Sequence, residues 1–186
     1  MNTQGKTILL HCCCAVCACG CIDRLLEEGY RITLFFSNSN LAPAKEWERR
    51  LAAMRTLAEL RDLPLIVDEP DHGAWLRHIA GLEEEPERGA RCERCFAFSL
   101  NRTAEKCRAL GLDVFATTLT VSPHKNSKLI FSVGSRWENF ECWDFKKKNG
   151  FQKAMQLSAE YGLYRQNYCG CEFSRRDAGL TEGKEK

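Results

Sequence analysis

Short apolar runs alternate with longer amphipathic segments along most of the chain. The runs are rich in β-branched and aliphatic residues and lack polar alternation, which predicts buried strands rather than half-exposed ones. The last of them is expected to form only a short edge strand. The pattern predicts strands at 7–10, 30–37, 63–67, 113–119 and 142–145.

Between these runs, apolar residues recur at helical spacing. In the segment 44–60, for example, Trp47, Leu51 and Leu57 fall on one face of a helix. Gly29 follows another such segment and is a natural helix end. The pattern predicts helices at 16–28, 44–60, 71–82, 92–110, 126–133 and 151–161, and an irregular chain after 163.

The order of these segments predicts the fold class. Alternating strands and helices are typical of an open, mostly parallel sheet with helices on both faces. We therefore predict a single Rossmann-like α/β domain over residues 1–177, followed by a disordered tail at 178–186. Ligands in such folds bind at the carboxyl ends of the strands. The segment 12–17 directly follows the first predicted strand and is expected at that edge.

Composition narrows the class of protein. The chain has 186 residues, of which 28% are charged and 44% hydrophobic, as in soluble globular domains. Its net charge of +2 is small for a strong nonspecific nucleic-acid binder. No apolar stretch approaches the roughly 18–20 residues of a membrane span, and the first residues lack a signal-peptide pattern. We expect a cytoplasmic protein that does not associate with membranes.

Cysteine is the most unusual feature of the composition. The chain has 12 cysteines, six of them within 9–21. Because cytoplasmic thiols stay reduced, metal binding and redox catalysis are better interpretations than structural disulfides. Cys19, Cys21 and Cys107 fall on helical patterns and are expected to pack in the core, whereas Cys12 and Cys142 suggest no role.

Two pairs of cysteines have the spacing of metal ligands. Cys92 and Cys95 lie three residues apart at the start of a predicted helix, so their sulfurs face one way. The helix N-terminus is expected to lower the pKa of these thiols. Cys13 and Cys14 lie at a turn, where the alternation of a strand breaks and neighbouring side chains can converge. Four thiolates suit zinc or an iron–sulfur cluster, and the spacing leaves both open, with a thioredoxin-like dithiol as a further alternative.

A third pair, Cys169 and Cys171, is separated by one glycine. A disulfide across a single residue closes a strained ring that is easily reduced, which favours a redox-active pair over two further metal ligands or two unconnected thiols. Polar and aromatic residues crowd against this pair and could stack on a base and clamp a phosphate, or only anchor the tail. They are Tyr164, Arg165, Gln166 and Tyr168.

Other polar residues have weaker signals. His11 precedes the cysteine triplet, and we favour a packed histidine at a strand end over a metal ligand or proton donor. Lysines at 125 and 128, and the run Lys146, Lys147 and Lys148, could contact phosphate, although a solvated face is the simpler interpretation of the run.

Several of these motifs together resemble one family. The sequence resembles the small, cobalamin-independent epoxyqueuosine reductases of queuosine biosynthesis over nearly its whole length. The matching stretches are LLHCCCAVC (9–17), FFSNSN (35–40), EWERRL (46–51), PLIV (64–67), WLRHIAGLEEEPERGARCERCF (75–96), FATTLTVSPHKN (115–126) and GLYRQNYCGCEFS (162–174).

The resemblance implies a specific oxidoreductase with an adenine-nucleotide alpha-hydrolase-like domain. Such an enzyme reduces the epoxide of epoxyqueuosine to queuosine at the wobble position of tRNAs with a GUN anticodon, those for tyrosine, histidine, asparagine and aspartate. The electron donor stays open. The resemblance places a [4Fe–4S] cluster on Cys13, Cys14, Cys92 and Cys95, a redox-active pair at Cys169 and Cys171, and a second iron beside the cluster with Cys17 as candidate ligand.

The chain departs from the family pattern in two ways. Val16 stands where the family usually has proline, and Cys19 and Cys21 are additional thiols that could compete for metal. Two other functions are retained as alternatives. A non-catalytic zinc protein would be colourless with one zinc per chain, and a thiol–disulfide oxidoreductase would use Cys92 and Cys95 without metal.

Overall fold

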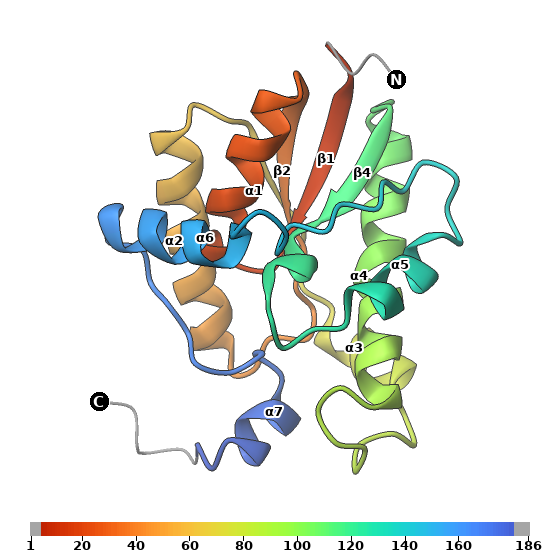
Figure 1. Ribbon diagram of the computed structural model, residues 1–186. Helices are drawn as coiled ribbons and strands as arrows, with labels where there is room; N and C mark the ends of the chain where they lie inside the picture. The colour runs from red at the N-terminus through yellow and green to blue at the C-terminus, as the bar shows by residue number, and fades with distance from the viewer. Residues whose placement is uncertain (1–4, 181–186) are drawn as a thin grey trace.

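The structure of the protein is a computed structural model, in which residues 5–180 are described (Figure 1). Its centre is a parallel sheet with the strand order β3-β2-β1-β4. Leu10 in β1 lies opposite Leu34 in β2 and Ala116 in β4. The predicted Rossmann-like α/β class is confirmed. The strands are β1 (Thr7–Cys12), β2 (Arg31–Phe36), β3 (Leu65–Val67) and β4 (Val114–Thr117).

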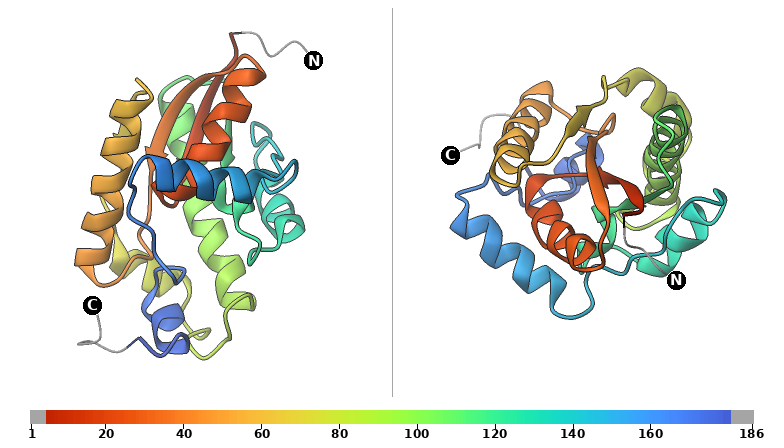
Figure 2. Two further views of the ribbon diagram at one scale, coloured as in Figure 1. Left: turned by 60° about the vertical axis from the view of Figure 1, so that its left-hand side comes forward. Right: turned by 90° about the horizontal axis from the view of Figure 1, so that it is seen from above.

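Helices cover both faces of this sheet (Figure 2). α1 and α2 lie on one face, with α6 packed on α1, and α4 with α5 lies on the other. The helices are α1 (Ala15–Glu27), α2 (Ala44–Leu60), α3 (His72–His78), α4 (Ala90–Ala109), α5 (Ser127–Gly134), α6 (Gly150–Glu160) and α7 (Glu172–Asp177), with a 3₁₀ turn, η1 (Thr118–Val121), after β4.

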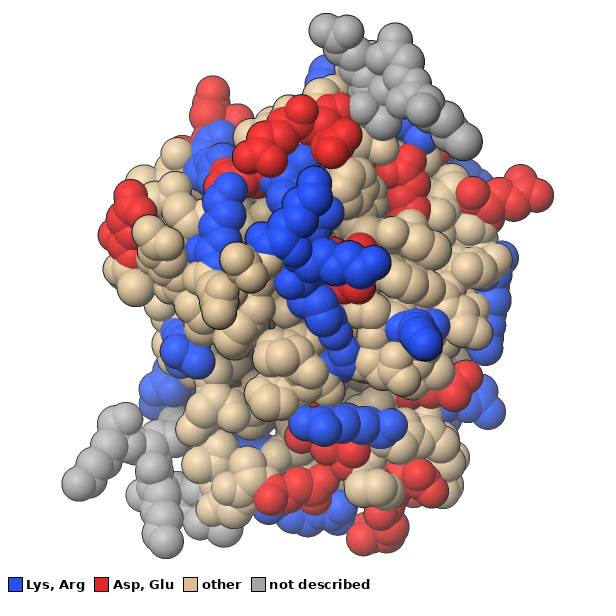
Figure 3. All heavy atoms as spheres, viewed as in Figure 1, with Lys and Arg blue, Asp and Glu red and all other residues tan. Residues whose placement is uncertain are grey.

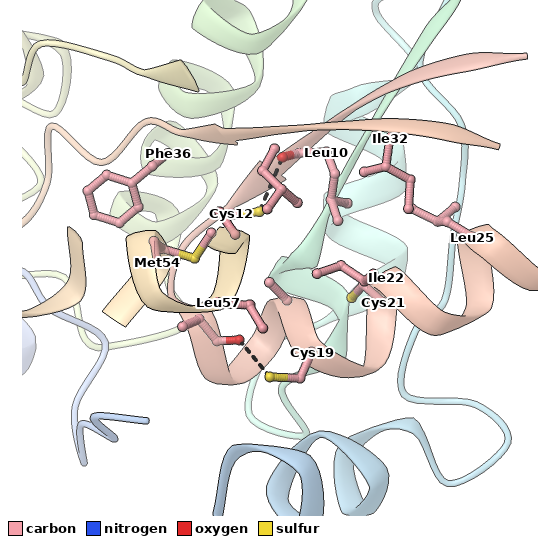
Figure 4. Packing of buried hydrophobic residues seen from close by; sticks show 14 of the residues in the cluster. Leu10, Cys12, Cys19, Cys21, Ile22, Leu25, Ile32, Phe36, Met54 and Leu57 are labelled. Carbon is pink, nitrogen blue, oxygen red and sulfur yellow. Dashed lines mark hydrogen bonds between the residues drawn. The ribbon is translucent and has the colours of Figure 1, made fainter. Parts of the chain in front are cut away.

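The alternation of side chains along β1 divides the interior into two cores. Ile8, Leu10 and Cys12 face α1 and α2, whereas Leu9 faces α4. Figure 4 shows the first core, in which Cys12, Cys19 and Cys21 pack among leucine and isoleucine side chains. Their burial, and that of Cys107 in the second core, confirms that Cys19, Cys21 and Cys107 are core residues.

The predicted edge strand at 142–145 is wrong. The chain touches the sheet slightly earlier, where Phe140 bridges Phe115 in a parallel sense. Further along, the Thr120 hydroxyl donates to the carbonyl of Trp143, so η1 rather than the sheet pairs with that part of the backbone.

Two helix predictions also need correction. The predicted helix at 71–82 ends at His78, and the region after 163, predicted to be irregular, contains α7. α7 begins because the Cys171 sulfur accepts a hydrogen bond from the Ser174 amide, a short-range cap that hydrophobic spacing does not reveal. Of the predicted tail, residues 178–180 directly follow α7, and 181–186 lie outside the described residues.

Within residues 5–180, no helix combines the length and apolar character that crossing a membrane requires. The carboxyl ends of β1, β2 and β4 point toward the half of the molecule that contains α7 (Figure 1). The loops after these strands therefore meet the C-terminal segment at one edge of the sheet, as the parallel order predicts.

Candidate redox and metal centre

A cavity of about 460 Å³ lies at the carboxyl edge of the sheet. Segments that are distant in the sequence contribute to it, including the β1–α1 turn, α4, the loop before α5 and the segment before α7. Side chains that could bind metal, carry charge or react line it together. Among them are Cys13, Cys14, Cys17, Cys95, Lys125 and Cys169.

The sulfurs of Cys13, Cys14 and Cys17 form the tightest group in this cavity. All three lie within 4.8 Å of one another. Cys14 is the N-cap of α1, and its sulfur accepts a hydrogen bond from the Cys17 amide at 3.5 Å. This cap turns the chain from strand to helix, so the adjacent cysteines converge instead of pointing to opposite faces. Soft sulfur ligands in this arrangement could hold a metal ion.

Hydrogen bonds within this group separate the pKa values of its thiols. Donation from Cys13, and then from Cys17, holds the pKa of Cys14 well below its usual value. Hydrogen bonding to Cys14 raises the pKa of Cys13, and hydrogen bonds with both neighbours raise the pKa of Cys17 well above normal. The neighbours of Cys14 therefore act as donors that favour its thiolate form.

His11 lies just before this turn and forms a hydrogen bond with each of its two ring nitrogens. Its Nε2 donates to the carbonyl of Ser37 at 3.0 Å, so its Nδ1, 2.8 Å from the Thr117 hydroxyl oxygen, accepts from that hydroxyl. Burial lowers the pKa of His11, which keeps the ring neutral. The interpretation of His11 as a packed, hydrogen-bonded histidine at a strand end is confirmed.

Cys92 and Cys95 occupy the first turns of α4. The indole Nε1 of Trp75 donates to the sulfur of Cys95 at 3.3 Å, and the amide of Arg88 donates to the sulfur of Cys92 at 3.2 Å. Cys92 packs with Cys13 against one apolar cluster, whereas Cys95 packs with Cys171 against another. α4 therefore lies between the β1–α1 turn and the C-terminal cysteines.

The expected lowering of the pKa of these two thiols is wrong. Burial raises the pKa of Cys92, and it raises that of Cys95 well above its usual value. The loss of hydration outweighs the favourable field of the helix N-terminus, because Trp75 and Ile79 pack around Cys95, and Leu119 and Ile130 pack around Cys92.

Cys169 and Cys171 belong to the segment just before α7, which also borders the cavity. Cys169 lines the cavity, and Cys171 is buried against Trp75 and Ile79. Burial raises the pKa of Cys171. Both cysteines are free thiols in this structure, and their pairing stays a prediction. Gly170 between them has a φ of +127°, a conformation that other residues rarely adopt.

Most of the residues singled out just before this pair line the cavity, but Tyr164 contacts α2 instead. Arg165, Gln166 and Tyr168 line the cavity, whereas the Tyr164 hydroxyl donates to Glu46 at 2.8 Å. Gln166 Oε1 and the Tyr168 hydroxyl are buried without a hydrogen-bond partner in the described part of the chain. Burial raises the pKa of Tyr168 to about 12. These two unpaired polar atoms are candidates for contacts with a ligand.

Sequence reasoning missed the buried ion pair of Glu46 and Arg50 in α2. Arg50 Nε lies 2.6 Å from Glu46 Oε1, and both side chains are only 2% exposed. Arg50 lines the cavity and donates to the carbonyl of Cys169 at 2.9 Å. The available signal was a Glu and an Arg at i and i+4 among the apolar positions of α2, where surface charges would not be expected.

One of the lysines that could contact phosphate lies among the cysteines. Lys125 is partly buried and lines the cavity with the thiols. Burial opposes its charge, yet the facing sulfurs of Cys169 and Cys13 outweigh burial and raise the pKa of Lys125.

The basic run 146–148 contacts the backbone of Lys125 through its first lysine. Lys146 Nζ donates to the carbonyl of Lys125 at 2.7 Å, whereas Lys147 and Lys148 are exposed. Figure 3 shows Lys and Arg side chains gathered on the face of the molecule where the chain enters α6. This patch is therefore next to the segment that lines the cavity.

Comparison with known proteins gives the family. Residues 8–177 match the family described as epoxyqueuosine reductase QueH. The chain belongs to the epoxyqueuosine reductase QueH family. It is an enzyme of the oxidoreductase class, as the sequence predicts.

Curated epoxyqueuosine reductases of this family match along nearly the whole chain. The protein from Streptococcus pyogenes serotype M1 is 37% identical over 94% of this chain and 72% of its own length. The one from Thermotoga maritima is 35% identical over 97% of this chain and 93% of its own length. The one from Acinetobacter baylyi is 32% identical over 98% of this chain and 88% of its own length.

Proposed function

We propose that this epoxyqueuosine reductase forms queuosine at the wobble position of tRNA, with a [4Fe–4S] cluster and a dithiol side by side in one cavity. Its substrates are the tRNAs with a GUN anticodon, those for tyrosine, histidine, asparagine and aspartate, and its location is the cytoplasm. The cysteines in these roles are Cys13, Cys14, Cys92 and Cys95 for the cluster and Cys169 with Cys171 for the dithiol.

One observation carries this proposal. Sulfurs from three distant segments, represented by Cys14, Cys95 and Cys169, line a single cavity at the carboxyl edge of the sheet. A structural zinc site needs no such cavity, and a thioredoxin-like enzyme needs only one cysteine pair. A substrate-sized space lined by several thiols suits a reaction in which electrons reach a bound substrate.

The residues fit an iron–sulfur cluster. The ligands offered are all thiols, which are the usual ligands of such clusters. The hydrogen bonds of Cys14 favour its thiolate form, and Trp75 donates to the sulfur of Cys95. Donors to ligand sulfurs are the contacts that stabilise and tune these centres. When bound there, the cluster supplies electrons one at a time and a Lewis-acidic iron.

A second iron is proposed beside this cluster, with Cys17 as a ligand. The support is the position of the Cys17 sulfur, within 4.8 Å of those of Cys13 and Cys14. The Cys17 sulfur is therefore close enough to bind a metal next to the proposed cluster ligands.

The dithiol accounts for the electron balance. Removing the epoxide oxygen as water takes up two electrons and two protons and leaves a carbon–carbon double bond. Oxidation of Cys169 and Cys171 to a disulfide releases two electrons and two protons. The two half-reactions therefore balance, and an external donor must reduce the disulfide again after each turnover.

Charged and polar groups of the chain hold the substrate for this reaction. Lys125 supplies positive charge inside the cavity, close to Cys13 and Cys169. The unpaired atoms of Gln166 and Tyr168 are available to the heteroatoms of the base. An anticodon loop presents unstacked bases, so the base can enter the cavity without opening a duplex. The exposed lysines of the basic run then contact the phosphates.

The direct test compares two cysteine-to-serine variants of the same segment. Cys14→Ser removes a proposed ligand, whereas Cys19→Ser changes a buried thiol that donates only to the carbonyl of Ala15. Each protein is purified without oxygen, analysed for iron and sulfide, and assayed by mass spectrometry for conversion of epoxyqueuosine-containing tRNA with a chemical reductant. We expect Cys14→Ser to lose most of its iron and its activity, and Cys19→Ser to keep both.

Two outcomes would contradict the proposal. A colourless wild-type protein with one zinc per chain would point to a zinc site. Full activity in the absence of iron would point to a reaction that uses thiols alone.

A further inference from the structure

We propose that Arg50 is a positioning residue that holds the Cys169–Cys171 loop in place and sets the reduction potential of this cysteine pair. The inference rests on the proposed use of the pair as a dithiol. It concerns a residue of α2, far in the sequence from the cysteines.

Arg50 is fixed from one side by a buried carboxylate. Its Nε lies 2.6 Å from Glu46 Oε1, and the other oxygen of Glu46 accepts from the Tyr164 hydroxyl at 2.8 Å. A buried ion pair is costly unless further hydrogen bonds satisfy both partners. The surroundings of Glu46 meet this condition and fix the plane of the guanidinium.

The other nitrogens of Arg50 are directed at the cysteine loop. One terminal nitrogen donates to the carbonyl of Cys169 at 2.9 Å and the other to that of Tyr168 at 3.4 Å. The planar guanidinium suits this double contact, which a lysine ammonium cannot reproduce. The amide of Ala42 also donates to the carbonyl of Gly170 at 2.9 Å. Successive carbonyls of the loop are therefore held by the scaffold.

The centre of the loop packs closely against Leu41 and Arg50. A Cβ on Gly170 would lie 2.3 Å from Cδ2 of Leu41 and 3.0 Å from both terminal nitrogens of Arg50. Contacts under 3.0 Å force a neighbour to shift. The position of the two thiols relative to the cavity thus depends on the guanidinium.

The charge of Arg50 favours the reduced form of the pair. Arg50 lines the cavity, and its charge is coupled to the sulfurs of Cys14 and Cys169. Forming the disulfide removes two electrons and two protons from the thiols, and a nearby cation stabilises the thiolate but not the disulfide. Stabilising the reduced form raises the reduction potential. A loop held in fixed geometry also strains a ring closed across one residue, with the same effect.

The test measures the potential of the pair in the cluster-loaded protein. Wild type and Arg50→Met are equilibrated without oxygen in buffers of reduced and oxidised glutathione, alkylated and digested with trypsin. Cleavage after Arg165 and Arg175 gives the peptide 166–175, in which Cys169 and Cys171 are the only cysteines. We expect Arg50→Met to shift the equilibrium toward the disulfide at least tenfold, which is roughly 30 mV for a two-electron couple.

Two further variants make the result specific. Arg55→Met removes an exposed arginine of the same helix and is expected to leave the equilibrium within twofold of wild type. Arg50→Lys keeps the charge but not the double contact, and its equilibrium should fall between those of wild type and Arg50→Met. If Arg50→Met does not fold, a shift in Arg50→Lys carries the test.

The outcomes separate this inference from the proposed function. A wild-type pair that forms a disulfide, with unchanged equilibria in both Arg50 variants, would overturn the role of Arg50 alone. A wild-type pair that forms no disulfide at any ratio of reduced to oxidised glutathione would overturn the dithiol itself, and with it both proposals.

Discussion

The indole nitrogen of Trp75 donates a hydrogen bond to the sulfur of Cys95 over 3.3 Å. Trp75 comes from α3 and Cys95 from the first turns of α4, and the ring is fully buried against Cys171. This contact is specific to the sulfur, because the rest of the indole ring packs against apolar and aromatic groups such as Phe173.

Trp75→Phe is expected to lower the midpoint potential of the iron–sulfur cluster while iron remains bound. Donors to ligand sulfurs stabilise the more negative, reduced state, so removing one disfavours reduction. A redox titration followed by electron paramagnetic resonance measures the effect. Trp47→Phe is the matched control, because its indole nitrogen has no hydrogen-bond partner among residues 5–180. Equal potentials in the two variants would argue against Cys95 as a ligand.

Lys125→Met is expected to lower kcat roughly tenfold or more, the loss of about 1.4 kcal/mol of transition-state stabilisation. The reason is that Lys125 provides positive charge beside the sulfurs of Cys13 and Cys169. Binding of tRNA should change little, because the side chain lines the cavity rather than the exposed face. Single-turnover assays and binding titrations separate the two effects. Lys45→Met, at an exposed lysine of α2, is the control.

Neutralising Lys147 and Lys148 should weaken tRNA binding and change kcat little, the opposite of the effect expected for Lys125→Met. Both side chains are exposed just before α6, so Lys147→Gln with Lys148→Gln is expected to weaken tRNA binding more than it slows turnover on a saturating anticodon stem-loop. The slope of log K against log salt should become shallower by about 0.7–0.9 per lysine. If the variant binds tRNA as tightly as wild type at every salt concentration, these lysines do not contact the tRNA.

Gly170→Ala should destabilise the protein more than Gly162→Ala does. Both glycines have positive φ, and placing alanine in such a conformation costs about 1–2 kcal/mol. At Gly162 a Cβ would meet no described heavy atom within 4 Å, but at Gly170 it would collide with Leu41. The clash adds about 1–3 kcal/mol. Equal free energies of unfolding in a denaturant titration would show that the loop is looser than described.

Much of the fold followed from local patterns. The segment 44–60 was predicted with the bounds that α2 has, because its apolar spacing is regular and Pro43 precedes it. The sheet order placed the turn at Cys13 and Cys14 on the correct edge. By contrast, α7 depends on a cap made by the Cys171 sulfur, and the bridge at Phe140 on a long-range pairing with Phe115. Neither leaves a periodic signal in the sequence.

The site was predicted less completely than the fold. The cysteine pairs were visible as spacings, but the positions of two cationic residues beside them, Arg50 and Lys125, were not. Local spacing predicts only a helix around Arg50 and a phosphate contact at Lys125, because burial of a charge depends on long-range partners such as Cys169. The pKa values of Cys92 and Cys95 were misjudged for the same reason, since their burial comes from tertiary packing.

The most direct test of the central claim is the metal content of the wild-type protein purified without oxygen. The account predicts a brown protein with about four iron and four sulfide ions per chain in its cluster, and further iron where the second site is filled. The same sample should convert epoxyqueuosine-containing tRNA to the queuosine form when a reductant is added. A colourless, sulfide-free protein that holds zinc and still performs this conversion would contradict it.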